Sequence, residues 1–463
     1  MLRFKKTFLN SILFIFLGLF IYACSKDDSI SPEEQQDDTD TIVIDTVPEP
    51  LTTIEYIKTF GGSGIDEAVS VVEANDGSFM ILGSTRSFDG DITDRSGNDS
   101  DYWLLKISKT SEIIWSKTYG GSDDEKATRI TKTNDGGFLL SGYATSIDGD
   151  VSNNAGFQDY WILKVDASGN KQWDKSFGFS GSDQASKAFQ TSDGGYFITG
   201  YFDVSASGGA GNDLQKRTQH GVGEYWGIKL DANGEKQWRR YFGGSNNDRS
   251  YDALETPDGG FLMTGTSESE DFDKLDFKGS YDYWAVRLTA TGDLLWTKSF
   301  GGEEIDNSYA SILTNDGNYI MVGDSRSSDQ DVTAPRGNAD AWMVKFDDNG
   351  NKIWQKSFGG SLFDTAHSIV QRSNGDYILS GHSRSNDGDL TKNNGVNDAW
   401  IFIVDSNGNL KLRTIVGGSG LDYASEAIET SDNKIVVVGN SESNDLDVPL
   451  NKGSKDALFF MIK

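Results

Sequence analysis

The chain has 463 residues, of which 42 are basic and 71 are acidic, so its formal charge at pH 7 is −29. Hydrophobic residues make up 36% and aromatic residues 12%, with 53 glycines and only 6 prolines, a composition that excludes a collagen-like or low-complexity disordered chain. The acidity argues against nucleic acid and anionic lipid surfaces as partners, because binding to them needs clustered lysine and arginine. Cations, neutral sugars and basic proteins remain as ligand classes.

Residues 1–23 have the pattern of a signal peptide. Arg3, Lys5 and Lys6 precede an apolar run that ends at Ala23, and the run is short for a membrane-spanning helix. The small residue directly before Cys24, the single cysteine of the chain, resembles a bacterial lipobox, in which this cysteine carries acyl chains such as palmitate. The alternative is a buried free thiol. Lipidation of Cys24 leaves no cysteine for a disulfide.

Residues 24–50 predict an acidic disordered stalk behind the lipidated cysteine. This segment carries nine acids against one lysine and three of the six prolines, so it has too few apolar groups to offset the entropy of ordering it. Its first residues, Ser25 to Asp28, resemble the export tag of Bacteroidota surface lipoproteins. We therefore expect an outer-membrane lipoprotein that faces the cell exterior and touches the membrane only through its anchor.

Residues 51–463 consist of seven copies of one unit. A glycine pair or near-equivalent marks each unit, beginning at Gly61, Gly120, Gly178, Gly243, Gly301, Gly359 and Gly417. The intervals are 59, 58, 65, 58, 58 and 58 residues. The fifth unit shows the elements best, with period-two runs over 308–313, 319–323, 341–346 and 352–358 separated by turn residues such as Asn-Asp-Gly. These patterns predict four strands per unit, joined as hairpins.

Seven four-stranded units predict an all-β, seven-bladed β-propeller. The chain begins this region with a fourth strand, Thr53 to Phe60, and ends on a third strand, Asp456 to Lys463. We expect these incomplete units to combine into one blade, which closes the ring and leaves no open edge.

Tryptophans twelve residues apart recur through the units. The set is Trp103 and Trp115, Trp161 and Trp173, Trp226 and Trp238, Trp284 and Trp296, Trp342 and Trp354, and Trp400 without a partner. Their regularity favours a structural role between blades over a stacking platform for sugars. The turn before the second tryptophan, as in Asp166 to Trp173, resembles the tryptophan-docking repeat of quinoprotein propellers. The cofactor does not follow, since the vicinal disulfide common in those enzymes is impossible here and the blade count differs.

An acid stands five residues past each marker glycine. The seven are Asp66, Glu125, Asp183, Asp248, Asp306, Asp364 and Asp422. The position predicts a ring of carboxylates near the mouth of the central channel. They either cap their own loops by accepting backbone N–H groups, which the pattern favours, or bind a cation or ligand on the axis.

The long loop between the second and third strands carries a further acidic pattern, Asp-x-Asp followed by a third acid, in six units. The residues are Asp89, Asp91 and Asp101; Asp148, Asp150 and Asp159; Asp271, Asp273 and Asp282; Asp329, Asp331 and Asp340; Asp387, Asp389 and Asp398; and Asp445, Asp447 and Asp456. Spaced carboxylates suit Ca²⁺, and no other cofactor is indicated. Asx-turns that hold the loop shape are the favoured alternative.

The third unit breaks the symmetry. It is 65 residues long, lacks the Asp-x-Asp pair, and its loop contains His220 shortly before Glu224. A general base with an acid partner is conceivable there, but loop insertions are usually neutral. His220 and Glu224 are therefore weak catalytic candidates.

The lipid anchor, the stalk and the repeated loops together favour a non-catalytic surface module that binds a glycan or a partner protein through its long loops. The repeat phrases Ser-Phe-Gly-Gly and Asp-Gly-Gly-Tyr resemble those of uncharacterised Bacteroidota lipoproteins and secreted proteins. Two alternatives stay open. One is a propeller-type glycoside hydrolase or polysaccharide lyase, and the other is a structural subunit of an outer-membrane complex.

Overall fold

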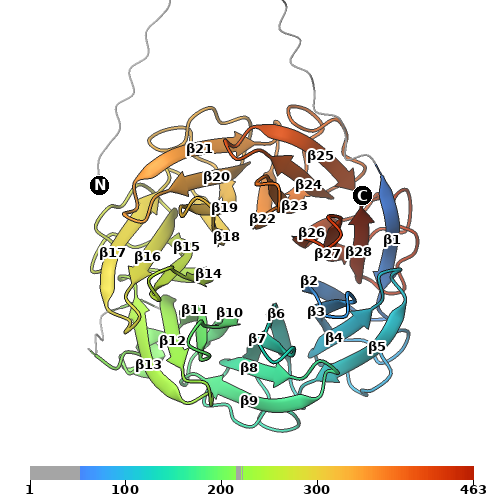
Figure 1. The fold of residues 1–463 in the computed structure, drawn as a ribbon, viewed down its shortest axis with the longest axis horizontal. Helices are drawn as coiled ribbons and strands as arrows, with labels where there is room; N and C mark the ends of the chain where they lie inside the picture. Colours follow the sequence, from blue (N-terminus) through green and yellow to red (C-terminus); the bar gives the residue numbers. More distant parts are fainter. Residues whose placement is uncertain (1–52, 215–219, 222) are drawn as a thin grey trace, which may run out of the picture. The chain divides into compact units, whose positions relative to one another are not determined.

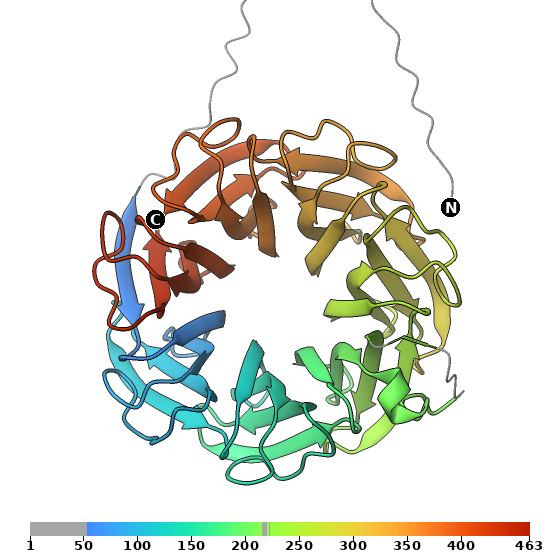
Figure 2. The same ribbon diagram turned by 180° about the vertical axis from the view of Figure 1, so that it is seen from behind.

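A computed structural model of the chain describes residues 53–214, 220–221 and 223–463. Within them, 28 strands form seven antiparallel sheets of four strands each, arranged as a ring around a central axis (Figure 1). Figure 2 shows the same ring from the opposite face. The seven-bladed propeller predicted from the repeats is confirmed. The expected signal peptide, Cys24 and the stalk lie outside the described residues.

The first four blades run in chain order from the innermost to the outermost strand. Blade 1 is β2 (Asp66–Glu73), β3 (Phe79–Thr85), β4 (Asp101–Ile107) and β5 (Ile113–Tyr119). Blade 2 is β6 (Glu125–Lys132), β7 (Phe138–Ala144), β8 (Asp159–Val165) and β9 (Lys171–Phe177). Blade 3 is β10 (Gln184–Gln190), β11 (Tyr196–Phe202), β12 (Glu224–Leu230) and β13 (Lys236–Phe242), with the one-turn helix α1 (Val204–Ser207) in its long loop. Blade 4 is β14 (Asp248–Glu255), β15 (Phe261–Ser267), β16 (Asp282–Leu288) and β17 (Leu294–Phe300).

The remaining blades repeat this order. Blade 5 is β18 (Asp306–Leu313), β19 (Tyr319–Ser325), β20 (Asp340–Phe346) and β21 (Lys352–Phe358). Blade 6 is β22 (Asp364–Gln371), β23 (Tyr377–Ser383), β24 (Asp398–Val404) and β25 (Leu410–Val416). Blade 7 takes β26 (Asp422–Glu429), β27 (Ile435–Ser441) and β28 (Asp456–Ile462) from the end of the chain and β1 (Ile54–Phe60) from its beginning.

Pairing of β1 with β28 closes the ring as expected. The two strands are antiparallel, with Phe60 opposite Ala457 and Lys58 opposite Phe459. The last blade is therefore a complete four-stranded sheet, and β28 has no unpaired edge at which another chain could add a strand.

The first tryptophan of each pair fills the wedge between neighbouring blades. Trp103, Trp161, Trp226, Trp284, Trp342 and Trp400 are each at most 1% exposed. At the boundary between blades 4 and 5, for example, Tyr283 packs against Trp342 with ring centroids 4.7 Å apart, and its hydroxyl donates to the Trp342 carbonyl at 3.0 Å. Buried aromatic rings of this size dominate a core, so the structural interpretation accounts for these six side chains.

In four of the five pairs the second tryptophan, at position 115, 238, 296 or 354, docks on a turn of the next blade. Trp296 Nε1 donates to the Asp348 carbonyl at 3.0 Å, and Gly350, with φ +77°, lies against the Trp296 ring. A Cβ on Gly350 would meet this ring at 3.4 Å in a backbone conformation that side chains rarely adopt. The turn glycine and the second tryptophan of the pair therefore pack against each other, and this contact gives both residues a structural role.

Strand alternation divides the connections between two faces. The turns between first and second strands, and between third and fourth strands, lie on one face, which we call the turn face. The inter-blade loops and the loops between second and third strands lie on the other, which we call the long-loop face. None of the helices in the described part of the chain is long and apolar enough to span a membrane.

Candidate functional site

The seven repeated acids begin the innermost strands but do not form a ring of exposed carboxylates. All seven side chains are 0% exposed. Asp66 is typical, since its Oδ2 accepts the Gly62 N–H at 2.7 Å and the Ser87 hydroxyl at 2.7 Å, while Oδ1 accepts the Thr85 hydroxyl. The hydrogen bonds are those of loop caps. At Asp66 both carboxylate oxygens accept hydrogen bonds within its own blade, as the favoured loop-cap interpretation expects, and binding of a cation or ligand on the axis stays a prediction.

Each of these acids faces a second buried carboxylate across a blade boundary. A Cβ added to Gly301 would lie 2.6 Å from Asp306 Oδ2 and 2.8 Å from Asp282 Oδ1, so a glycine is required between the two groups. Burial raises the pKa of Asp306 to about 6, and the nearby Asp282 adds to the shift. At the boundary between blades 1 and 2, burial raises the pKa of Asp101 to about 6 and that of Glu125 to about 7.

The Asp-x-Asp carboxylates join the long loop to the inter-blade loop of the same blade. Asp89 Oδ1 accepts the Ser63 N–H at 2.7 Å, and Asp91 Oδ2 accepts the Gly61 N–H at 3.0 Å. The first of these bonds recurs at Asp148, Asp271, Asp329, Asp387 and Asp445. The second recurs at Asp150, Asp273, Asp331, Asp389 and Asp447.

These contacts are the Asx-type interactions expected where the loop carboxylates hold the shape of the loop, which was the favoured alternative to calcium binding. The third acids of the pattern are used in a similar way, for example Asp456 Oδ2, which accepts the Lys452 N–H at 2.7 Å. Over residues 53–214, 220–221 and 223–463, no group of three or more His, Cys, Asp or Glu side chains is arranged to hold a metal ion. Calcium binding by the loops stays a prediction, and this arrangement does not favour it.

The weak catalytic candidates His220 and Glu224 form a buried pair. His220 Nδ1 lies 3.0 Å from Glu224 Oε2, and both side chains are 0% exposed. The imidazole is stacked on Phe272 with ring centroids 4.9 Å apart. A general base must reach the proton that it abstracts, and this position does not offer the pair to a substrate.

Exposed apolar side chains are concentrated on the long-loop face. Of the seventeen large hydrophobic residues that are exposed in the described part of the chain, twelve lie in its loops: Ile65, Phe88, Ile147, Phe157, Leu214, Phe272, Leu275, Phe277, Leu362, Val396, Leu446 and Leu450. The other five, Ile113, Ile114, Leu294, Leu295 and Ile353, lie at the beginning of outermost strands. The long-loop face therefore carries most of the exposed apolar side chains of the described residues.

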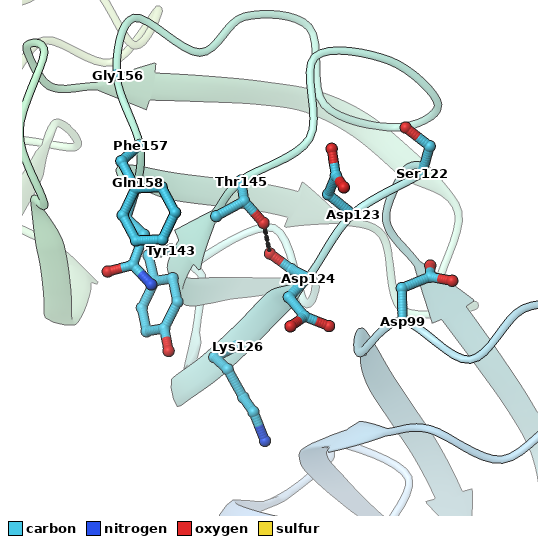
Figure 3. Close-up of a pocket in the computed structure, with 10 residues that line it drawn as sticks. All are labelled: Asp99, Ser122, Asp123, Asp124, Lys126, Tyr143, Thr145, Gly156, Phe157 and Gln158. Atoms are coloured by element: carbon cyan, nitrogen blue, oxygen red, sulfur yellow. Dashed lines mark hydrogen bonds between the residues drawn. The ribbon is translucent and has the colours of Figure 1, made fainter.

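A pocket of about 500 Å³ opens on this face at the boundary of blades 1 and 2. Figure 3 shows Tyr143 and Phe157 on one side of it and Asp99 and Asp123 on the other. Phe157 is 68% exposed, and Asp123 is exposed as well. The pocket therefore presents an aromatic ring and a carboxylate together.

The same combination recurs on the long-loop face near blades 4 and 5. A pocket of about 570 Å³ there is lined by Phe277, which is 43% exposed, together with Glu268, Glu270 and Glu303. These residues occur in one unit only, so the repeat pattern did not point to them. Apolar residues in otherwise polar loops, such as Phe157 in Gly-Phe-Gln, were nevertheless a visible signal.

Comparison with known proteins gives distant matches. No protein-family model matches the chain. Regulatory protein FlaEY of Caulobacter vibrioides is 21% identical over an alignment of 388 residues that covers 75% of this chain and 40% of that protein. The chain thus spans less than half the length of this curated relative.

Solved structures with a similar fold include the Pan2 WD40 domain of Neurospora crassa (TM-score 0.47, 9% identity, 89% of this chain and 97% of that one). A protein of unknown function from Bacteroides caccae (TM-score 0.40, 12% identity, 68% and 89%) is another, as is a DUF4221 member from Bacteroides vulgatus (TM-score 0.37, 8% identity, 89% and 98%). Resemblance at this level concerns the fold and does not extend to function.

Proposed function

We propose that the protein is a non-catalytic binding module, held at the outer membrane by acyl chains on Cys24, whose long-loop face binds a partner protein. The observation that carries the proposal is the pairing of exposed Phe157 and Phe277 with carboxylates in two pockets of one face. A partner that fits both has basic side chains next to apolar ones, since arginine and lysine combine a cation with an apolar stem.

Charge supports the same partner chemistry. Residues 51–463 carry a formal charge of −24, which accelerates the approach of a basic surface and repels an acidic one. Aliphatic loop residues such as Leu275, which is 87% exposed, and Ile147, which is 75% exposed, extend the apolar surface beyond the two aromatic pockets, and an extended apolar surface suits a protein more than a glycan.

Site-specific photo-crosslinking of the full-length lipoprotein in intact cells tests this proposal. A photoreactive residue in place of Phe157 is compared with one in place of Ile114, which is 53% exposed and lies on β5 away from the long loops. We expect one protein adduct of defined mass from position 157 and none from position 114. Equal labelling at the two positions would contradict the proposal.

The captured protein is then purified and its affinity measured with Phe157→Ala and Asp123→Lys variants. We expect each to bind at least about tenfold more weakly, and the wild-type affinity to fall with salt. Unchanged affinity in both variants would contradict the proposed binding surface. Retention of the protein on a glycan array, with no protein captured in cells, would indicate that the ligand is a glycan and not a protein.

Anchoring is tested separately. Cys24→Ala is expected to release the protein from the membrane fraction, and protease added to intact cells is expected to degrade the wild type. Retention of the Cys24→Ala variant, or resistance to external protease, would contradict the anchor or the surface location respectively.

A further inference from the structure

A further cavity lies in the central channel and differs in chemistry from the two pockets of the long-loop face. Its volume is about 340 Å³, and its lining includes Thr128, Arg129, Tyr201, Tyr251 and Tyr309. No aspartate or glutamate is among the described residues that line it, although acids outnumber bases in this chain by 71 to 42. A cavity of this size fits one small ligand.

Three tyrosines form one wall of this cavity. Tyr201 of β11, Tyr251 of β14 and Tyr309 of β18 follow one another around the channel, with ring centroids 6.5 and 5.7 Å apart. Arg249 covers the Tyr201 ring at 5.1 Å. The three rings are half-buried and all three line the cavity, so part of each ring is accessible from inside it.

Arg129 of β6 supplies the charged group of the cavity. Its Nη1 contacts Glu426 Oε1, and Glu426 is itself fixed by the Ser70 hydroxyl at 2.6 Å and the Val71 N–H at 2.8 Å. The guanidinium is therefore held in place through one nitrogen. In the described structure its Nε and Nη2 donate to no protein group, and together they form the edge that binds a carboxylate with two hydrogen bonds.

The residues of this cavity are not part of the repeat. The third residue after the repeated acid differs between blades and is Val69, Thr128, Ser186, Tyr251, Tyr309, His367 or Ser425. The fourth residue is Ser70, Arg129, Lys187, Asp252, Ala310, Ser368 or Glu426. A role in blade packing would recur in every blade, as it does for the tryptophans. The tyrosine wall and Arg129 instead occur once each, on opposite sides of one cavity.

We propose that this cavity binds a sugar acid, a monosaccharide or short oligosaccharide unit that carries a carboxylate. The tyrosine faces suit the apolar C–H face of a sugar ring, and the Nε and Nη2 edge of Arg129 pairs with the carboxylate. The hydroxyls of Thr128 and Ser186 line the cavity and donate their own protons to backbone carbonyls, so each can still accept a hydrogen bond from a sugar hydroxyl. This site is independent of the long-loop face and its partner protein.

Isothermal titration of the full-length lipoprotein in detergent with D-glucuronate, D-galacturonate and N-acetylneuraminate tests the proposal, with D-glucose as the neutral parent. We expect saturable binding of at least one sugar acid and at least about tenfold weaker binding of glucose. Absence of binding by all three acids at about 10 mM, or glucose binding as tightly, would overturn it.

Arg129→Gln and Lys187→Gln form a matched pair of variants. Both residues occupy the same strand position, and both are paired with a carboxylate, Lys187 with Asp252 at 2.6 Å, but Lys187 does not line the cavity. We expect Arg129→Gln to weaken sugar-acid binding about tenfold or more and Lys187→Gln to change it less than about twofold. Equal losses in the two variants would place the effect in folding and overturn the assignment of Arg129.

Discussion

The inter-blade boundaries and the channel wall use the same innermost strands in opposite ways. At each boundary the strand begins with a buried acid that caps a loop, as Asp66 and Asp422 do in different blades. Three and four residues further on, the same strands carry side chains that differ from blade to blade, among them Tyr251 and Arg129. Residues that recur in every blade therefore build the scaffold, and residues that occur once are the candidates for ligand contact.

Replacement of a repeated tryptophan should have the largest effect on stability. Trp342 is fully buried and packs against Tyr283, so Trp342→Ala is expected to lower the free energy of unfolding by about 3–5 kcal/mol. Urea unfolding followed by far-UV circular dichroism measures it. The matched channel variant Tyr251→Ala, at a half-buried position, should lose clearly less. Similar losses of unfolding free energy in both variants would contradict the distinction between scaffold residues and channel residues.

Removal of a repeated acid should have the next largest effect. Asp422 accepts the Gly418 N–H at 2.8 Å and the Ser443 hydroxyl at 2.7 Å, and its other oxygen accepts the Ser441 hydroxyl. Asp422→Ala leaves these buried donors without an acceptor, which is expected to cost about 2–4 kcal/mol. Asp422→Asn retains one oxygen and should lose less. A loss below about 1 kcal/mol in the alanine variant would show that the cap is dispensable.

The buried carboxyl pairs predict that stability falls as the pH rises. Burial raises the pKa of Glu125 and Asp183 to about 7 and that of Asp340 to about 6. The folded protein binds these protons more tightly than the unfolded chain does, so the contribution is present below the ordinary carboxyl pKa and is lost as the pH rises through about 6 to 7.

On the turn face the pKa of two aspartates is lowered and not raised. Hydrogen bonds and nearby lysines outweigh the effect of partial burial and lower the pKa of Asp135 and Asp193 to about 2. That contribution is present above the ordinary carboxyl pKa and is lost as the pH falls toward 2. We therefore expect a higher melting temperature at pH 5 than at pH 8. Glu125→Gln should flatten the slope between these values, and a higher melting temperature at pH 8 would contradict the effect of the buried pairs.

An exposed loop aspartate should matter least. Asp387 Oδ1 accepts one N–H, from Ser361 at 2.7 Å, at an exposed position, so Asp387→Ala is expected to cost about 0.5–1 kcal/mol. Added Ca²⁺ should leave the melting temperature of the wild type unchanged if the loop carboxylates act only as acceptors. A rise with Ca²⁺ that disappears on chelation and in Asp387→Ala would establish the calcium site.

The fold was predictable because the same sequence pattern occurs in every blade. Seven copies of one turn-and-strand pattern fix the blade, and the strand left over at Ile54–Phe60 fixes the closure. The candidate site was predictable only in its location on the long loops. The individual residues, such as Phe157 and Arg129, occur in a single blade, so periodicity gave no reason to select them.

The sequence by itself determined the architecture, the structural role of the first tryptophans and the acidity of the loops. Only the tertiary structure showed how deeply the repeated acids are buried and which groups they cap, because their burial depends on donors such as Ser87 and Thr85, about twenty residues away in the chain. It also brought Arg129, Tyr251 and Tyr309 to one cavity. The ring brings together blades that are distant in sequence. The sequence pattern of a single unit therefore cannot predict which residues of different blades face each other across the channel.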